Sequence, residues 1–456
     1  MIHQFEKNGL FFLLDVNSGA IHLLDEISAA VAALIDENMS ADCPTSLLRQ
    51  LAQYPEESVR EAYQELYQLK QAGQLFAPDT YENVSQYMPV NAPVKALCLH
   101  VAHDCNLRCQ YCFAATGDFG QGRKIMPVEV ARKAIDFVIS RSGKRHNIEI
   151  DFFGGEPLMA WDTVVDTVQY ARSLEEKYQK HFRFTITTNG LLLNEEKRKF
   201  INENMDNVVL SLDGRPEVND RFRKTINGKG SYNTIVPSFQ ALIRERDPKK
   251  DYYARGTFTA HNLDFTNDIV HIADAGFDRL SIEPVAAEAG CEYALTEADL
   301  PIINAEYDRL TELLRQRKEQ GKPITFFHFM VDLQQGPCVI KRLRGCGAGY
   351  EYVAVTPDGD IYPCHQFVGK EVFRQGNVLD GTFDMEIAQN FAGMNLYTRP
   401  KCRECWAKFY CSGGCSAANY NQNGDLNDSY DLGCAMERKR LECAIYLKAL
   451  EKICAD

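Results

Sequence analysis

Six strand-like segments alternate with helix-like segments between Lys95 and about Gln320, and this alternation constrains the fold more than any other feature. A helical connection that returns the chain in the same direction places each new strand parallel to the last. The pattern therefore predicts an α/β fold with a parallel sheet and with chemistry at the carboxyl ends of its strands. Whether the sheet closes into a barrel is left open by the pattern. The segments are KALCLHV, NIEIDFF, FRFTITTN, NVVLSLDG, YYARGTFTA and DRLSIEPV.

Residues 1–80 are expected to form a separate winged-helix-like module. Two turn signals, Asn8-Gly9 and Asn17-Ser18-Gly19, divide three short strands, and helical patterns follow them. The usual partner of a winged helix is DNA, but residues 1–82 hold 4 Lys+Arg and 13 Asp+Glu, a net charge of −9. Nucleic acid is therefore not expected as a partner. We predict a linker over residues 81–94, the parallel-sheet part over 95–320 and a Cys-rich part over 321–456.

The chain as a whole is acidic, with a net charge of −13, and it contains 16 cysteines. Its first residues lack the basic region of a signal peptide, and no window approaches the ~20 apolar residues of a membrane span. We therefore expect a cytoplasmic protein with no membrane partner. Because thiols stay reduced in the cytosol, grouped cysteines there are expected to be metal ligands or catalytic residues.

Three cysteines stand directly after the first strand of the parallel sheet, in the segment CNLRCQYC over residues 105–112. Three thiolates on one loop can each bind one iron of a [4Fe–4S] cube and leave the fourth iron free for a small ligand. Structural zinc normally takes four protein ligands, so a lone triplet fits zinc poorly. The segment predicts an iron–sulfur centre with Cys105, Cys109 and Cys112 as its ligands and catalytic residues.

Glycines and polar residues end the next three strands, and the fifth strand carries Arg255. Gly154 and Gly155 permit a close approach of the backbone to a ligand, and Glu156 and Pro157 follow them. The guanidinium of Arg255 is suited to a carboxylate. Each feature alone is more typical of a capped strand-to-helix turn. Together, after the triplet, they predict a small-ligand site, with these further members: Thr188, Asn189, Ser211 and Asp213.

The C-terminal part has a second cysteine pattern, C-x2-C-x5-C-x3-C, which begins at Cys402. Upstream, 12 residues separate Cys346 from Gly359, and 4 separate Gly359 from the next cysteine. A C-x2-C pair alone is typical of a zinc ribbon. Because this part has few long apolar runs, we expect it to need metal to fold. The cysteines of the pattern are Cys346, Cys364, Cys402, Cys405, Cys411, Cys415 and Cys434.

The triplet, the GGEP segment at 154–157 and the polar strand ends resemble the radical S-adenosylmethionine (SAM) superfamily, and Tyr111 matches the aromatic residue beside its third cysteine. The C-terminal pattern is similar to the SPASM domain, which carries two auxiliary [4Fe–4S] clusters in its family. The resemblance implies a partial (β/α)6 barrel, three [4Fe–4S] clusters and bound SAM. It implies one auxiliary cluster on Cys346, Cys364 and Cys415. It implies that the second auxiliary cluster is bound by Cys402, Cys405, Cys411 and Cys434.

The first auxiliary cluster is then one ligand short. Cys338 lies eight residues before Cys346 and is one candidate for the missing ligand. The alternative is an open iron that binds a substrate thiolate. Zinc is the simpler competitor for both cysteine groups, and the presence of the triplet in the same chain disfavours it.

Across its full length the chain resembles maturases of six-cysteines-in-forty-five-residues (SCIFF) peptides. This resemblance implies that the front module binds the leader of a Cys-rich ribosomal precursor peptide as an added strand. It implies that a 5′-deoxyadenosyl radical removes a carbon-bound hydrogen, that a cysteine sulfur joins this carbon, and that a flavodoxin- or ferredoxin-like protein donates electrons. The alternatives are formylglycine formation, carbon–carbon crosslinking and, in a different class, a non-catalytic iron–sulfur electron carrier.

Several other candidates are expected to be structural. His365 is predicted to be an exposed or packed imidazole rather than a donor to the neighbouring cysteine ligand, and Cys98 is predicted to behave as a small core residue. Phe326, Phe327 and Phe329 are expected in the core.

Overall fold

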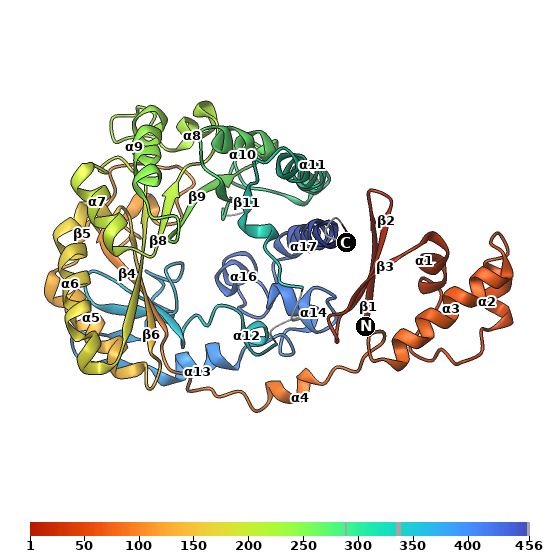
Figure 1. Ribbon diagram of the computed structural model, residues 1–456. Helices are drawn as coiled ribbons and strands as arrows, with labels where there is room; N and C mark the ends of the chain where they lie inside the picture. The colour runs from red at the N-terminus through yellow and green to blue at the C-terminus, as the bar shows by residue number, and fades with distance from the viewer. Residues whose placement is uncertain (288–289, 334–338, 454–456) are drawn as a thin grey trace.

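The computed structural model describes residues 1–287, 290–333 and 339–453. Figure 1 shows a curved sheet with outer helices, a central C-terminal part and, on the far side of that part, the N-terminal module. Within the described ranges, no helix combines the length and the apolar character that crossing a membrane requires.

The N-terminal module contains the three predicted strands as an antiparallel sheet in the order β1-β2-β3. Asn8 and Gly9 both have positive φ angles, 52° and 78°, which the tight turn between the first two strands requires. The second of the helices below is short and was not predicted. The elements are β1 (Ile2–Lys7), β2 (Leu10–Asp15), β3 (Ile21–Leu24), α1 (Glu26–Ala32), α2 (Thr45–Gln50) and α3 (Glu56–Gln71).

Both faces of this small sheet are covered. On one face, buried Leu13 packs with residues of the module's own helices. On the other, buried Phe12 packs with Ile445 and Tyr446 of the C-terminal helix α17 (Asp431–Ile453). Lys7, only 7 % exposed, bonds to Asp308 of α11 (Leu300–Glu319). The module is therefore docked against the rest of the chain, with the outer edge of β3 unpaired among the described strands.

The segment predicted as a linker also packs against the C-terminal part. It contains the short helix α4 (Tyr81–Ser85), and the ring of Tyr81 meets the ring of Phe409 edge-on, with 5.3 Å between centroids. Arg344 donates a hydrogen bond of 2.6 Å to the carbonyl of Pro89. These contacts hold the connection along the surface of the C-terminal part, as Figure 1 shows.

The six predicted strands form the expected parallel sheet in the order β10-β9-β8-β7-β6-β4. The sheet remains open, because its path ends at β11 on one side and at β15 on the other. Beyond β4, a strand of the C-terminal part, β12, adds in parallel. This answers what the sequence left open: the barrel is partial. The core strands are β4 (Ala96–His103), β6 (Asn147–Gly154), β7 (His181–Thr188), β8 (Asn207–Ser211), β9 (Asp251–Phe258) and β10 (Arg279–Pro284).

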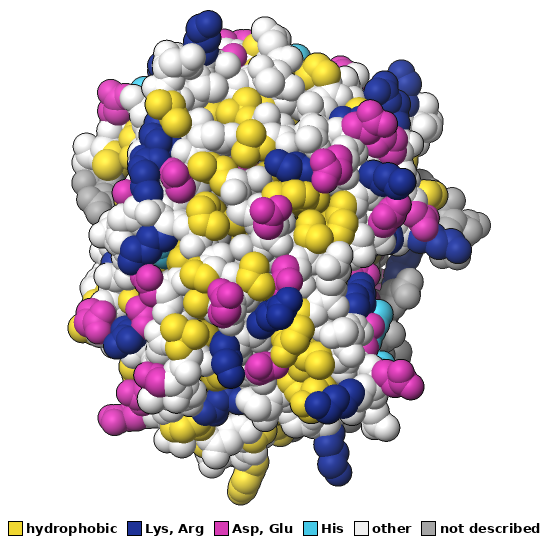
Figure 2. All heavy atoms as spheres, turned by 90° about the vertical axis from the view of Figure 1, so that its left-hand side faces the viewer, with side chains coloured by type: hydrophobic (Ala, Val, Ile, Leu, Met, Phe, Trp, Pro, Cys, Tyr) yellow, Lys and Arg dark blue, Asp and Glu magenta, His cyan; other side chains and the backbone are white. Residues whose placement is uncertain are grey.

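Alternation along the strands separates core from cavity. In β6, Ile148, Ile150 and Phe152 are fully buried against the helices, whereas Asp151 and Phe153 face the hollow of the curved sheet. On the outer helical face, Figure 2 shows positive and negative side chains interspersed, with no large basic patch. The barrel helices are α5 (Val128–Arg141), α6 (Trp161–Tyr178), α7 (Glu195–Asn204), α8 (Pro216–Phe222), α9 (Tyr232–Glu245) and α10 (Phe265–Asp274).

Apart from the long helix α17, the C-terminal part is built from short elements, as its lack of long apolar runs predicts. Phe326 and Phe329 are buried as expected, but Phe327 is 50 % exposed, because a 3-10 turn over Phe327–Phe329 points it away from the core; its predicted burial is wrong. The remaining elements are β5 (Lys124–Ile125), β11 (Thr325–Phe326), α12 (Val339–Arg344), β12 (Tyr352–Val355), β13 (Asp360–Tyr362), β14 (Gly376–Asn377), β15 (Thr382–Phe383), α13 (Met385–Gly393), α14 (Pro400–Arg403), α15 (Lys408–Cys411) and α16 (Ser416–Asn423).

Candidate functional site

A cavity of about 570 Å³ lies inside the curved sheet. Its wall is made by inward-facing residues of the parallel strands, by the loop after β4 and by Tyr352 and His365 of the C-terminal part. The three cysteines of the triplet line it together with both glycines of the GGEP segment. The carboxyl ends of the strands therefore meet at one chamber, as the fold predicts.

The cysteine triplet occupies the loop that leaves β4. Burial raises the pKa of the Cys105 thiol to about 11 and that of Cys109 to about 12, and it raises that of Cys112 as well. Thiolates in such a place need a compensating cation, which bound iron supplies. Three cavity-facing thiols on one loop therefore fit a [4Fe–4S] cube with one iron free.

The two glycines of the GGEP segment allow backbone to approach backbone. A Cβ on Gly154 would lie 2.2 Å from the carbonyl oxygen of Ala102, and one on Gly155 would lie 2.1 Å from that of Asp104. The Gly155 N–H donates to the Ala102 carbonyl at 2.7 Å. Only glycine fits here, and the contact sets the end of β6 directly against the chain that leads into Cys105.

Glu156 ties two strand ends together. Its carboxylate is 1 % exposed and accepts hydrogen bonds from the Thr188 hydroxyl at 2.8 Å and from the Asn189 N–H at 2.7 Å. The Asn189 side-chain amide in turn lies 3.5 Å from the Cys105 sulfur. All of these residues, with Pro157, line the cavity, and their mutual bonds place Asn189 beside the triplet.

A buried ion pair stands behind the triplet. Asp213 is fully buried and accepts a hydrogen bond of 2.6 Å from the Tyr111 hydroxyl. Arg223 donates to the same hydroxyl at 2.7 Å and lies 3.6 Å from the Asp213 carboxylate. Burial nevertheless raises the pKa of Asp213. Tyr111 and Arg223 line the cavity, and Asp213 positions both; its predicted contact with a cofactor remains a prediction.

Arg223 was missed by sequence reasoning, since no motif marks it. It is 9 % exposed, and its Nε is buried with no hydrogen-bond partner among the described residues. An orphan cationic donor at the cavity wall, near Cys105 and Cys109, is suited to an anionic ligand group such as a carboxylate.

Two further predicted residues also line the chamber. Ser211 ends β8, and Arg255 of β9 forms a two-pronged pair with Glu283 of β10, at 2.8 and 2.5 Å. Although burial alone would raise it, Arg255 holds the pKa of Glu283 at about 2. Arg255 is therefore already engaged with a carboxylate of this chain, which no sequence motif indicated.

His365 packs as predicted and also borders the chamber. Its ring lies 5.0 Å from that of Phe153, and the Tyr352 hydroxyl lies 3.3 Å from its Nδ1. Cys98 is 1 % exposed within a core cluster, again as predicted.

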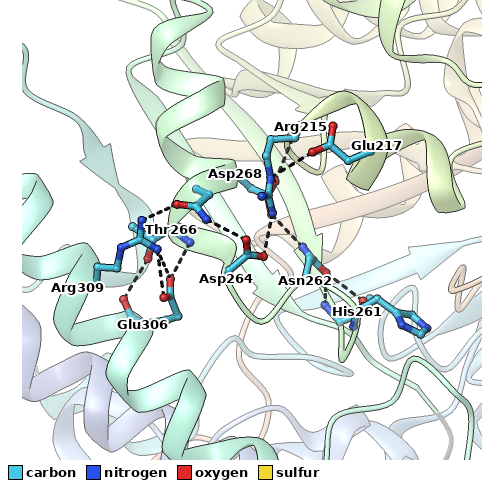
Figure 3. A network of polar contacts seen from close by, with 11 residues as sticks. Arg215, Glu217, His261, Asn262, Asp264, Thr266, Asp268, Glu306 and Arg309 are labelled. Carbon is cyan, nitrogen blue, oxygen red and sulfur yellow. Dashed lines mark hydrogen bonds and ion pairs between the residues drawn. The ribbon is translucent and has the colours of Figure 1, made fainter.

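The turn after β8 is braced by the polar network of Figure 3. Arg215 donates from its backbone and its Nε to the fully buried Asp268 of α10, and from a terminal nitrogen to Asp264. Gly214 has a φ of 150°, and a Cβ there would lie 2.3 Å from an Asp268 oxygen. This close fit fixes the backbone that follows Asp213.

The seven C-terminal cysteines gather into two groups. One group is defined by electrostatic interactions among three neighbouring thiols, those of Cys346, Cys364 and Cys415. Cys411 and Cys434 both interact with Cys402, and Cys434 also interacts with Cys405. This is the division implied by the SPASM resemblance. Cys338, the candidate fourth ligand of the first group, lies outside the described residues.

The spacing within these groups differs from that of a mononuclear site. Among residues 1–287, 290–333 and 339–453, no three His, Cys, Asp or Glu side chains converge as ligands of a single metal ion do. Four sulfurs around one zinc ion crowd together at Zn–S distances of about 2.3 Å. A [4Fe–4S] cube carries one thiolate per iron and holds its four sulfur ligands farther apart.

Comparison with protein families defines the class. Residues 99–251 match the radical SAM superfamily, and residues 346–406 match the SPASM domain, an iron–sulfur cluster-binding domain. The chain thus has the radical SAM α/β fold with a partial, barrel-like sheet, followed by a C-terminal SPASM domain.

The chain is also similar to several individual proteins. The chain is 26 % identical to a cysteine-type anaerobic sulfatase-maturating enzyme of Clostridium novyi, covering 68 % of this chain and 85 % of that one. It is 24 % identical to the radical SAM cyclopropyl synthase TigE of Paramaledivibacter caminithermalis, covering 73 % and 70 %. The solved structure of anSMEcpe with bound AdoMet has a TM-score of 0.65 at 20 % identity, covering 78 % of this chain and 99 % of that one.

Proposed function

We propose that this chain is a radical SAM enzyme that forms thioether crosslinks in a Cys-rich ribosomal precursor peptide. The observation that carries the proposal is the convergence of the cysteine triplet, the GGEP segment and the strand-end polar residues on one cavity. A relative named as a sulfatase-maturating enzyme supports a protein or peptide substrate, and another relative is named as a radical SAM cyclopropyl synthase.

Three [4Fe–4S] clusters and SAM are the proposed cofactors. When bound, they supply a 5′-deoxyadenosyl radical and a place for the leftover electron. Cys105, Cys109 and Cys112 would hold the first cluster, and the orphan Nε of Arg223 and the side chain of Asn189 would orient SAM beside it. The curved sheet would exclude water and stray hydrogen donors from the target carbon. The physiological reductant would be a flavodoxin- or ferredoxin-like protein.

The two C-terminal cysteine groups would hold the auxiliary clusters. The group of Cys346, Cys364 and Cys415 provides three ligands, so its fourth iron either takes Cys338 or stays open to a substrate thiolate. An open iron beside the chamber would activate the thiol that joins the carbon.

A co-expression experiment tests this function. We expect the chain, produced anaerobically with a Cys-rich precursor peptide encoded near its gene, to remove two hydrogens from the peptide per crosslink. A thioether also makes one cysteine resistant to alkylation. Conversion of a cysteine to formylglycine would instead exchange sulfur and two hydrogens for oxygen, which mass spectrometry separates. Absence of any SAM cleavage after cluster reconstitution would contradict the proposal as a whole.

The front module is proposed to bind the leader of this peptide at the free edge of β3 by strand addition. Its acidic charge suits a leader with basic residues. Leu23 on this edge is 43 % exposed.

We expect the variant Leu23→Asp to weaken binding of a labelled synthetic leader at least about fivefold, because it places a charge beside the added strand. Fluorescence anisotropy measures this, and SAM cleavage without peptide should be unchanged. Leu34→Asp is the matched control: Leu34 is 46 % exposed but lies just after α1, away from the edge. Equal weakening by both variants would argue against binding at β3.

A further inference from the structure

The proposed reaction must dispose of a proton, and this inference rests on that proposed function. Joining a thiol sulfur to a carbon removes one hydrogen from each atom. The carbon loses its hydrogen as an atom, which leaves one electron and the thiol proton to be taken up elsewhere. A proton acceptor is therefore needed inside the chamber, within reach of the substrate.

Most carboxylates around the chamber are already occupied. Glu156 is bonded to Thr188 and Asn189, and Glu283 is paired with Arg255. The nearby imidazole of His328 has its Nδ1 beside Arg440 at 3.0 Å, and burial and this cation lower its pKa to about 3. None of these groups is suited to take a proton at neutral pH.

Asp151 differs from all of them. It lies on the inward face of β6, three residues before the GGEP segment, and lines the same cavity as the cysteine triplet. In the strand ladders its neighbours are Cys98 of β4 and Thr185 of β7. It is partly exposed to the chamber rather than sealed in the core.

The groups that face Asp151 leave its carboxylate available as a base. Burial raises its pKa to about 7, and Glu149 on the same strand adds to the rise, whereas a hydrogen bond with Thr185 lowers it. Cys98 and Tyr352 interact with it from β4 and β12, and both keep their protons at neutral pH, since burial raises the pKa of each. No cation among the described residues acts on the carboxylate.

We propose that Asp151 is the catalytic residue that accepts the thiol proton when the sulfur–carbon bond forms. The balance is complete: the C–H bond breaks and its hydrogen atom ends in 5′-deoxyadenosine, and the S–H bond breaks and its proton moves to the Asp151 carboxylate. The new C–S bond then forms, and one electron passes to an auxiliary cluster of the proposed function.

The variant Asp151→Asn tests this assignment in the reconstituted enzyme. The rate of crosslink formation should fall at least about tenfold at pH 7.5. The rate of 5′-deoxyadenosine formation should stay within about twofold of that of the unsubstituted enzyme, because SAM cleavage needs no thiol deprotonation. In the unsubstituted enzyme, the ratio of crosslink to 5′-deoxyadenosine should rise with pH through about 7, and the variant should lose this rise.

Glu149→Gln is the matched control. It removes a carboxylate from the same face of β6, but one that is 57 % exposed and lies 3.7 Å from Arg183. Its crosslinking should stay within about twofold of the unsubstituted enzyme and should keep the pH-dependent rise.

Thermal unfolding of the reconstituted, cluster-loaded chain gives a second readout. The folded pKa of Asp151 lies above its ordinary value of 3.8, so its ionisation costs stability as pH rises through about 7. The unfolding temperature of Asp151→Asn relative to the unsubstituted chain should therefore increase between pH 6 and 8.

The outcomes separate this inference from the proposed function. Crosslinking by Asp151→Asn at the original rate and with the original pH profile overturns the inference and leaves the function standing. Parallel loss of SAM cleavage overturns it too, because that indicates a structural role. Failure of the unsubstituted enzyme to cleave SAM overturns the proposed function itself.

Discussion

Replacement of Cys105, Cys109 and Cys112 together by alanine is expected to abolish SAM cleavage, the largest effect of any change considered. The three thiols line the chamber on one loop. Among the described residues, the other cysteine that lines the chamber is Cys98, which is buried in the core. About four of roughly twelve irons should be lost, because each cube holds four. Iron analysis and 5′-deoxyadenosine formation with dithionite measure the two effects.

The control for this variant changes cysteines outside all three groups. Cys43 lies in the front module and Cys291 in the loop after β10, both half-buried. The double variant Cys43→Ala/Cys291→Ala should keep about twelve irons and full SAM cleavage. Loss of all iron from the triple variant, or 5′-deoxyadenosine formation by it, would contradict the assignment of a separate SAM cluster to the triplet.

The parallel direction of the six strands could be predicted because it depends on local connections. Each helical crossover returns the chain in the same direction, so six βα units suffice to give a parallel sheet. The addition of β12 to β4 could not be predicted, since Tyr352 and its partner Ala96 are far apart in the chain. Which remote strand joins an exposed edge depends on tertiary packing that periodicity does not encode.

Site residues could be predicted from the sequence where a motif marks the end of a strand. Gly154 and Gly155 were recognised as residues of close approach, but what they approach is the chain before Cys105, which the sequence could not specify. Asp213 illustrates the same limit. A polar residue at a strand end can face a ligand or a neighbour, and here its partners are Tyr111 and Arg223.

Asp151 and Arg223 were missed for different reasons. Arg223 lies in a turn without a motif, and its importance comes from burial beside Asp213, which appears only in the fold. Asp151 did leave a signal. Glu149 and Asp151 are polar residues at every second position of a strand whose other positions are apolar. Because the apolar positions are expected to pack against the helices, this alternation indicates that Asp151 faces the barrel interior.

Arg223→Met is expected to cost the folded barrel about 3–5 kcal/mol at pH 8, because it leaves the fully buried Asp213 without its cation. The cost should be smaller at pH 5. Without Arg223 the folded pKa of Asp213 rises further above its unfolded value, so the carboxyl is protonated at low pH and becomes a buried anion as pH rises. Urea unfolding at the two pH values measures the difference.

Two further variants test whether the loss of stability comes from the Arg223–Asp213 ion pair rather than from the Arg223 side chain alone. Arg221→Met removes an exposed arginine of the neighbouring helix and should change stability by less than about 0.5 kcal/mol. Adding Asp213→Asn to Arg223→Met removes the unpaired charge, so the double variant should regain stability at pH 8 and lose the pH dependence. If Arg223→Met were equally destabilised at both pH values, the loss would come from packing, and the ion pair would not be what holds Tyr111 behind the triplet.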